Sequence, residues 1–313
     1  MRAAIINKWG DHNVFKLADM PKPTPSPDQI LIKVFTSSVN PVDWKHRIGN
    51  HKLFLGSKFP IILGYDVCGE VIEIGSKITR FKKGDIVVGD LDNKYGGGLA
   101  EYAVAHENCF SHKPQNINNE QGAAITLASL TALQALRDKG NLIANQKVVI
   151  NGASGGVGHF AVQIAQILGA SVIAVAGPNN QTFIEGFNPY KTIDYSKFDI
   201  KTLEEKVDVF FDVVGNLSYM KVKHLLSKGG TYINPHPRPI ILIHKIPAFL
   251  SGKKVKSLLR KHIADDLDLI CRWINDKKLK ITVDKIFNLE DISEAHDYAE
   301  NKRGKGKVVV KIV

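Results

Sequence analysis

The chain has 313 residues, of which 44% are hydrophobic and 23% charged, values typical of a globular protein long enough to form two domains. Its three cysteines, Cys68, Cys109 and Cys271, are odd in number and far apart, which argues against a disulfide framework. The sequence contains no Cys-x-x-Cys, which argues against a structural zinc site. The apolar patch at the N-terminus is too short for a signal peptide, so we expect a cytoplasmic protein.

The net charge of +11 is compatible with a nucleic acid, an anionic membrane or a polyanionic small molecule as the partner. The densest basic cluster lies in residues 253–261, close to an apolar run at 240–250. Such a segment is compatible with a membrane surface, but a solvated helix face near a domain boundary is the simpler interpretation of a single cluster. No basic stretch is interleaved with aromatic residues, which argues against a nucleic-acid partner.

The first third of the chain predicts short β-strands. Apolar, largely β-branched runs occupy residues 2–6, 29–39, 67–74, 85–89 and 99–104, with a proline-rich loop at 21–27. Glycines at 64, 69, 75, 84 and 89 fit the bulges and corners of a small closed barrel. Apolar residues then recur at helical spacing over 119–140, which predicts a helix that leads into a second domain.

Residues 147–169 predict a strand, a tight turn and a helix. The turn consists of Ala153, Ser154, Gly155, Gly156, Val157 and Gly158, an Ala-x-Gly-x-x-Gly version of the dinucleotide fingerprint. A second apolar run at 171–176 follows at once, which completes the βαβ unit that the fingerprint requires. Because the first amides of a helix attract phosphate, the turn predicts a dinucleotide site, with a phosphate-free structural turn as the alternative.

The alternation of strands and helices continues after this unit. We expect strands at 191–195, 207–214 and 231–234, and helices at 183–187 and 219–226. This order predicts a doubly wound parallel sheet, whose ligands bind at the carboxyl ends of its strands. Helices at 263–274 and 291–301 and a strand at 307–313 are expected to close the chain.

Several motifs occur in a telling order: VNPVDWK at 39–45, LGYDVCGEV at 63–71, FKKGD at 81–85, GLAEY at 98–102, the glycine turn, IDY at 193–195 and GKVVV at 306–310. In these motifs the chain resembles the medium-chain dehydrogenase/reductase superfamily, in its zinc-free branch of quinone oxidoreductases and enone (alkenal) reductases. The resemblance implies an α/β protein with a split GroES-like β-barrel catalytic domain, residues 1–120 and 262–313, and a Rossmann dinucleotide-binding domain, residues 121–261.

The same resemblance bears on metal binding. Zinc-using relatives carry a cysteine at the position of Asn40, a histidine at that of Tyr65 and a third ligand near Leu127. None of these three residues is a usual zinc ligand, so we expect no zinc. A zinc-dependent alcohol dehydrogenase stays an alternative, as does a nucleic-acid-binding, crystallin-like protein with vestigial reductase activity.

The resemblance also implies cofactor contacts. It places Thr131 beside the nicotinamide, Val214 and Gly215 near the ribose, and Tyr195 near the adenosine end. Residues 177–181 lack the acid that NAD-selective sites use, whereas Lys191 and Lys197 flank Tyr195, so we expect NADPH to be preferred over NADH.

The expected activity is hydride transfer from NAD(P)H to a quinone or to the carbon–carbon double bond of an α,β-unsaturated carbonyl compound. Asn40, Asp43 and Lys45 are the expected catalytic residues: Asn40 to hold a substrate oxygen or the nicotinamide edge, and Lys45 to donate to the developing enolate oxygen. The simpler interpretations are a turn-capping amide for Asn40 and an exposed side chain for Lys45. A homodimer is compatible with the family.

Overall fold

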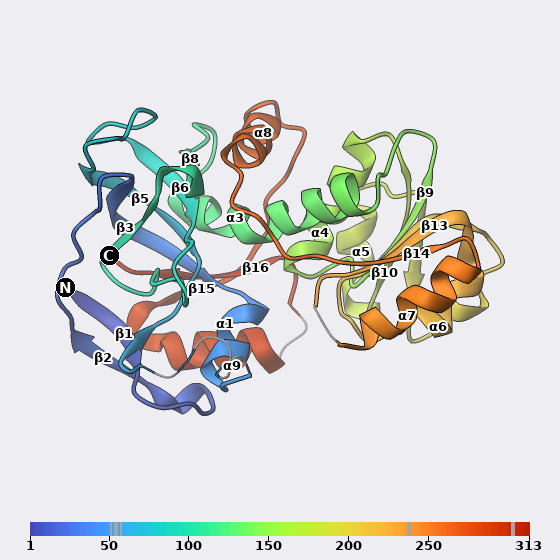
Figure 1. Ribbon diagram of the computed structural model, residues 1–313, viewed down its shortest axis with the longest axis horizontal. Coiled ribbons are helices and arrows are strands. Elements are labelled where there is room, and N and C mark those ends of the chain that lie inside the picture. Colours follow the sequence, from blue (N-terminus) through green and yellow to red (C-terminus); the bar gives the residue numbers. More distant parts are fainter. Residues whose placement is uncertain (51, 53–55, 57, 237–238, 302–303) are drawn as a thin grey trace. The chain divides into compact units, whose positions relative to one another are not determined.

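The computed structural model describes residues 1–50, 52, 56, 58–236, 239–301 and 304–313, and it divides into two compact units (Figure 1). Unit 1 consists of Met1–Leu127, His262–Lys277 and Ile281–Val313, and unit 2 of Ala128–Lys261 and Lys278–Lys280. The division into domains at 120/121 and 261/262 stays a prediction. Within the described part of the chain, no helix combines the length and apolar character needed to cross a membrane.

Unit 1 is built from two sheets. The smaller has the order β2-β1-β4, and the larger the order β15-β16-β3-β5-β6-β8, with β7 also paired to β3. The strands are β1 (Arg2–Ile6), β2 (Phe15–Asp19), β3 (Gln29–Val39), β4 (Ile61–Ile62), β5 (Asp66–Ile74), β6 (Ile86–Asp90), β7 (Tyr102–His106), β8 (Phe110–His112), β15 (Val283–Asn288) and β16 (Lys307–Lys311). Buried residues of both sheets share one apolar core, as expected for a small barrel.

The C-terminal strand returns to this barrel. β16 pairs antiparallel with β3, with Val308 opposite Val39, and β15 pairs parallel with β16. The sequence predicted β16 without identifying its partner. The expected bulges are confirmed at Gly69, where an added Cβ would lie 2.1 Å from the Lys33 carbonyl oxygen and where the β3–β5 register shifts.

In the described part of unit 1, three helices lie wholly within the unit: α1 (Pro41–Arg47), α8 (Ala264–Asn275) and α9 (Ile292–Asn301). The sequence predicted only a bend after Asn40, whereas the structure places a helix of two turns there. The helix begins at Pro41, where the missing N–H costs no intrahelical bond. Strands β2, β4, β8 and β15 were also not predicted, because they are short or lack a clear alternation of apolar and polar residues.

Unit 2 contains the predicted doubly wound sheet. All of its strand pairs are parallel, in the order β11-β10-β9-β12-β13-β14. The strands are β9 (Lys147–Asn151), β10 (Ser171–Ala176), β11 (Lys191–Asp194), β12 (Val207–Asp212), β13 (Leu226–Asn234) and β14 (Lys254–Ser257), and the helices are α4 (Gly156–Ile167), α5 (Gln181–Glu185), α6 (Tyr219–Val222) and α7 (Pro239–Leu250). Helix α3 (Asn119–Leu133), which continues as a π-helix (Gln134–Lys139), contains the boundary between the units.

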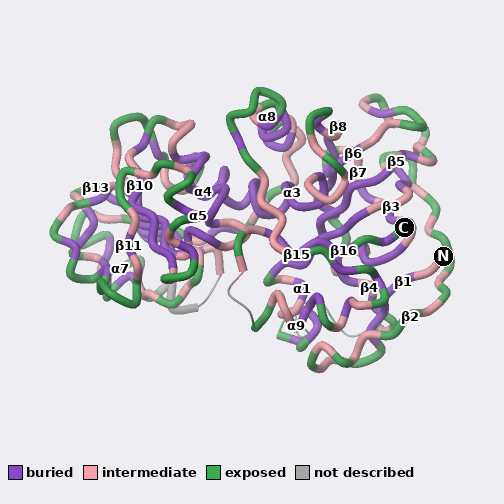
Figure 2. Tube along the Cα trace, turned by 180° about the vertical axis from the view of Figure 1, so that it is seen from behind, coloured by how far each residue is buried: buried purple, intermediate pink, exposed green. Residues whose placement is uncertain are grey.

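The four central strands of unit 2, β10, β9, β12 and β13, are buried along most of their length (Figure 2). One face of the sheet carries Val149, Phe210 and Tyr232, which share a core with Tyr219 of α6 and Ala248 of α7. This arrangement fits the near-continuous apolar runs of the central strands.

The basic segment at 253–261 differs from the expected helix face. Lys254–Ser257 forms edge strand β14, in which exposed Lys254 and Lys256 flank buried Val255. Exposed and buried side chains therefore alternate as in a strand, and this alternation did not predict a strand because it spans only four residues. In the preceding apolar run, the side chains of residues 239–242 lie outside the described part of the chain.

Candidate functional site

The glycine turn follows β9 as the fingerprint requires. Gly152 has φ +87°, and the amides of Gly152 and Ala153 donate to the Val175 carbonyl at 3.1 and 2.9 Å, which fixes the turn on the neighbouring strand β10. Gly155 is the N-cap of α4 and has extended backbone, and as a glycine it has no side chain that could cap the helix. The helix therefore begins with the amides of Gly156, Val157 and Gly158, which have no carbonyl partner within the helix.

Two glycines of the turn have different surroundings. A Cβ on Gly158 would lie 2.0 Å from the Gly152 carbonyl oxygen, so this residue allows the helix to pack closely on the strand. A Cβ on Gly155 would meet only that same oxygen, at 3.7 Å. The space beside Gly155 is therefore open, and a diphosphate can approach the backbone there. The turn fits a dinucleotide.

Ser154 links the turn to the segment after β10. The Asn180 side-chain amide donates to Ser154 Oγ at 2.9 Å, and both residues are buried. Tyr195, which is 44% exposed, follows β11, and its ring lies so close to Gly177 that a Cβ there would be 2.8 Å from the hydroxyl oxygen. The turn, Asn180 and Tyr195 thus gather at the carboxyl ends of adjacent parallel strands, where such sheets bind ligands.

Val214 and Gly215 lie at the same edge of the sheet. A Cβ on Gly152 would be 2.5 Å from Val214 Cγ2, so Val214 covers the start of the turn while remaining 51% exposed. Buried Asp212 holds this loop: its carboxylate accepts hydrogen bonds from the Asn151 side chain at 2.7 Å and from the Gly215 and Leu217 amides at 3.0 and 2.9 Å. Burial raises the pKa of Asp212, although these hydrogen bonds oppose the rise.

The sequence interpretation missed Asn180 and Asp212. The signal for Asp212 was an acid at the end of a buried apolar strand, which needs partners to be stable there. Thr131 is buried in the part of α3 that belongs to unit 2. Its place beside the nicotinamide stays a prediction.

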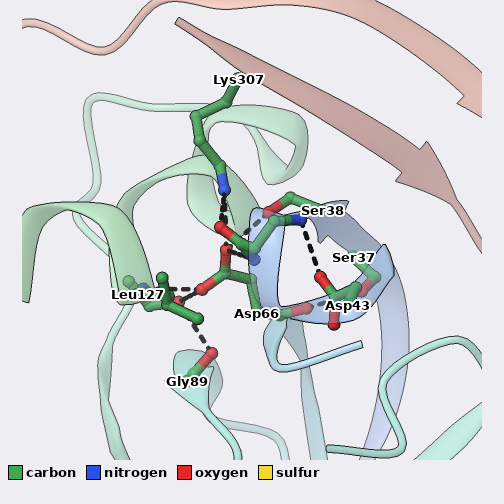
Figure 3. A network of polar contacts seen from close by, with 9 residues as sticks. Ser37, Ser38, Asp43, Asp66, Gly89, Leu127 and Lys307 are labelled. Atoms are coloured by element: carbon green, nitrogen blue, oxygen red, sulfur yellow. Dashed lines mark hydrogen bonds and ion pairs between the residues drawn. The ribbon is translucent and has the colours of Figure 1, made fainter. Parts of the chain in front are cut away.

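In unit 1, the expected catalytic segment meets a buried polar network (Figure 3). Its centre is Asp66, which is 0% exposed. Asp66 Oδ2 accepts hydrogen bonds from Ser38 Oγ at 2.6 Å and Asn40 Nδ2 at 2.8 Å, and it pairs with Lys307 Nζ at 3.1 Å. Asp66 Oδ1 accepts from the Leu127 amide at 2.7 Å and from the Thr126 hydroxyl.

Lys307 also donates to Asn40 Oδ1, so the Asn40 amide bridges the ion pair. Lys307 is only 2% exposed, and a lysine is rarely so buried unless a charged partner such as Asp66 lies beside it. Burial disfavours ionisation of Asp66, but the Lys307 ammonium and the hydrogen bonds from Ser38, Thr126 and Asn40 outweigh it and lower the pKa of Asp66. No sequence pattern predicted that Lys307, inside the expected last strand, would be buried.

Asp43 and Asn40 shape the start of α1. Asn40 has extended backbone, as the following proline predicts, and its amide donates to Asp43 Oδ2 at 2.7 Å. Asp43 is 1% exposed, and its Oδ1 atom has no hydrogen-bond partner in the part of the chain that the structure describes. Burial raises the pKa of Asp43 to about 7, with the neighbouring Asp66 charge contributing, although its hydrogen bond from the Asn40 amide opposes the rise.

Lys45 lies one turn beyond Asn40 and is partly exposed. Helix α1 holds it, and its backbone carbonyl accepts a hydrogen bond from the Asn50 amide at 3.0 Å. The structure thus brings Asn40 and Asp43 into one buried network and leaves Lys45 partly open to solvent. Their catalytic roles stay predictions.

The three positions that hold zinc in zinc-using relatives do not fit this metal. The Asn40 amide bonds to Asp66 and Lys307, the Tyr65 hydroxyl donates to the Lys94 carbonyl at 2.9 Å, and Leu127 has no donor side chain. Zinc sites use thiolate, imidazole or carboxylate ligands. Across the described ranges, no group of three or more His, Cys, Asp or Glu side chains is arranged to hold a metal ion.

Comparison with known proteins places these features in a family. The model of the alcohol dehydrogenase GroES-like domain matches residues 26–115, and a model described as zinc-binding dehydrogenase matches residues 190–310. The chloroplast envelope quinone oxidoreductase homolog of Arabidopsis thaliana is 33% identical, over 99% of this chain and 98% of the relative. The NADPH-dependent alkenal/one oxidoreductase of the same plant is 32% identical, over 99% of this chain and 79% of the relative.

Solved structures agree. The quinone oxidoreductase from Coxiella burnetii has a TM-score of 0.93 at 30% identity, covering 100% of this chain and 99% of that one. The resemblance deduced from the ordered motifs is therefore confirmed, as is the combination of a GroES-like barrel with a Rossmann sheet. The chain belongs to the medium-chain dehydrogenase/reductase superfamily, in its quinone oxidoreductase branch.

Proposed function

We propose that this chain is an NADPH-dependent reductase that transfers hydride to a quinone or to the carbon–carbon double bond of an α,β-unsaturated carbonyl compound, without zinc. The observation that carries the proposal is the open space at Gly155 in a complete dinucleotide turn, in a chain whose relatives are named quinone oxidoreductase and NADPH-dependent alkenal/one oxidoreductase. The reduced nicotinamide supplies the hydride when it is bound.

Unit 2 binds and orients the cofactor in this proposal. The amides at the start of α4 hold the diphosphate, and Asp212 fixes the Val214–Gly215 loop beside the turn. Of the two lysines that flank Tyr195, Lys191 forms an ion pair with Glu205 at 3.6 Å. Lys197 is therefore the better candidate for a contact with the 2′-phosphate of NADPH.

Unit 1 supplies the residues that stabilise the acceptor. Hydride addition to a quinone or enone places negative charge on an oxygen, and hydrogen-bond donors are sufficient to stabilise it. Lys45 is the proposed donor to this oxygen. Asp66 and Lys307 position Asn40 through its side-chain amide, and Asp43 positions the start of α1, from which Lys45 projects.

The test follows NADPH oxidation by the purified chain at about 340 nm with quinones, short enals and aromatic enones as acceptors. We expect turnover with at least one of these classes, unchanged by a zinc chelator. Turnover of primary alcohols with NAD⁺ that requires stoichiometric zinc would instead support the alternative of a zinc alcohol dehydrogenase. No turnover with any acceptor, despite NADPH binding, would contradict the proposed reaction.

A further inference from the structure

The positive charge of this protein is concentrated in one segment. Residues 213–264 contain ten lysines and arginines and no aspartate or glutamate, so this segment alone carries nearly all of the net charge of +11 that the whole chain has. This segment includes α6, β13, α7 and β14 of unit 2. A surface formed by it attracts polyanions or anionic surfaces.

Helix α7 adds an exposed apolar face to this segment. Ile243, Ile246, Phe249 and Leu250 are 64%, 69%, 82% and 79% exposed, and their spacing places them on one side of the helix. On the other side, His244 and Ala248 are buried, the latter in the core beneath the helix. These four exposed side chains, which we call the α7 face, leave a large apolar surface in contact with water.

Lysines gather at the C-terminal end of this face. The Lys253 amide donates to the Ala248 carbonyl at 2.8 Å, and Lys253 Nζ donates to the Lys223 carbonyl at 2.5 Å. Lys206 Nζ donates to the neighbouring His224 carbonyl at 2.6 Å, and burial together with the Lys206 and Lys223 charges lowers the pKa of Lys253. Exposed Lys245 lies on α7 itself.

We propose that the α7 face and its flanking lysines bind the surface of a bilayer that contains anionic lipids. An apolar helix face enters the boundary between headgroups and acyl chains, while lysines contact the anionic headgroups. A second copy of the chain fits less well, because a twofold contact would bring two strongly basic segments together. A nucleic acid would use the lysines but leave the apolar side chains in water.

The experiment measures sedimentation of the full chain with vesicles of phosphatidylcholine, with and without phosphatidylglycerol. We expect binding only to the anionic vesicles, weakened about tenfold or more in Phe249→Ser/Leu250→Ser because two large apolar side chains are removed. Lys245→Gln/Lys253→Gln should weaken binding about fivefold or more for each lysine.

Matched controls separate this surface from general charge and hydrophobicity. Lys82→Gln/Lys83→Gln removes the same charge from exposed positions of unit 1, and Ile143→Ser, 63% exposed, matches Ile246→Ser, 69% exposed. Binding should remain in both controls and fall in Ile246→Ser. NADPH oxidation without vesicles should be unchanged in every variant, which shows that each is folded.

Three outcomes would overturn the proposal. One is equal binding to both kinds of vesicle, or none to either. Another is an equal loss of binding in the control and test variants. The third is a concentration-dependent dimer, measured by analytical ultracentrifugation, that Phe249→Ser/Leu250→Ser abolishes while vesicle binding stays unchanged, because this result would assign the α7 face to a second copy.

Discussion

Gly155→Ala distinguishes a ligand-binding turn from a purely structural one. Gly155 has φ −75° and ψ −179°, a conformation that alanine adopts without strain, and an added Cβ would meet only the Gly152 carbonyl oxygen, at 3.7 Å. The folded chain therefore has room for the methyl group. A bound diphosphate would compete with it for the same space.

The expected magnitudes differ widely for folding and binding. Alanine restricts the unfolded chain, which stabilises by about 0.4–1 kcal/mol, and it is a poorer N-cap than glycine, which offsets part of that gain. The free energy of unfolding should change by less than about 1 kcal/mol. Losing one charge-assisted hydrogen bond from an amide to a phosphate costs about 1.5–3 kcal/mol, so NADPH affinity should fall roughly 10- to 100-fold.

The assay combines a fluorescence titration with NADPH and thermal unfolding of the unliganded protein. Gly158→Ala is the matched control, because its Cβ would lie 2.0 Å from the Gly152 carbonyl oxygen. That overpacking should destabilise the protein by about 1–3 kcal/mol and lower its melting temperature. Wild-type NADPH affinity in Gly155→Ala would refute the reasoning, because it would mean that no phosphate approaches this residue.

Four further predictions concern charged side chains. Lys45→Ala should lower kcat by about 10- to 1,000-fold with nearly unchanged NADPH affinity, whereas unchanged turnover on every accepted quinone and enone would remove Lys45 from the chemistry. Lys307→Met leaves the Asp66 carboxylate buried without its cation, and urea unfolding should show a loss of about 3–5 kcal/mol that Asp66→Asn/Lys307→Met partly restores; a loss below about 1 kcal/mol would contradict this. Asp43 has a raised pKa of about 7, so its protonated carboxyl stabilises the folded state, and this stabilisation is complete below about pH 4 and is lost as the pH rises towards 7. The free energy of unfolding of the wild type minus that of Asp43→Asn should therefore fall by up to about 4 kcal/mol over this range, and a difference that does not change with pH would disprove the effect. The wild type should bind NADPH more tightly than NADH, and Lys197→Gln should reduce this preference about fivefold or more, whereas equal affinities in the wild type would rule it out.

Local sequence patterns determined much of the fold. β1, β3 and β9 begin and end where their apolar runs do, and the turn between β9 and α4 follows from its glycines alone. These elements were predictable because a short apolar, largely β-branched run or a glycine-rich turn is enough to indicate each of them. Helix α7 was missed because its apolar residues face solvent on one side and the core on the other, which removes the usual contrast between faces.

Only the tertiary structure decided how distant residues combine. Lys307 and Asp66 are separated by 241 positions in the sequence. Their ion pair exists because β16, which contains Lys307, pairs with β3, and β3 also pairs with β5, which begins at Asp66. Likewise, Asp212 supports the glycine turn because β12 pairs with β9. The sequence by itself determined the residue types of the dinucleotide turn and its local backbone. The buried network around Asn40 depended on strand pairing, since a charge enters the core only where folding supplies its partners.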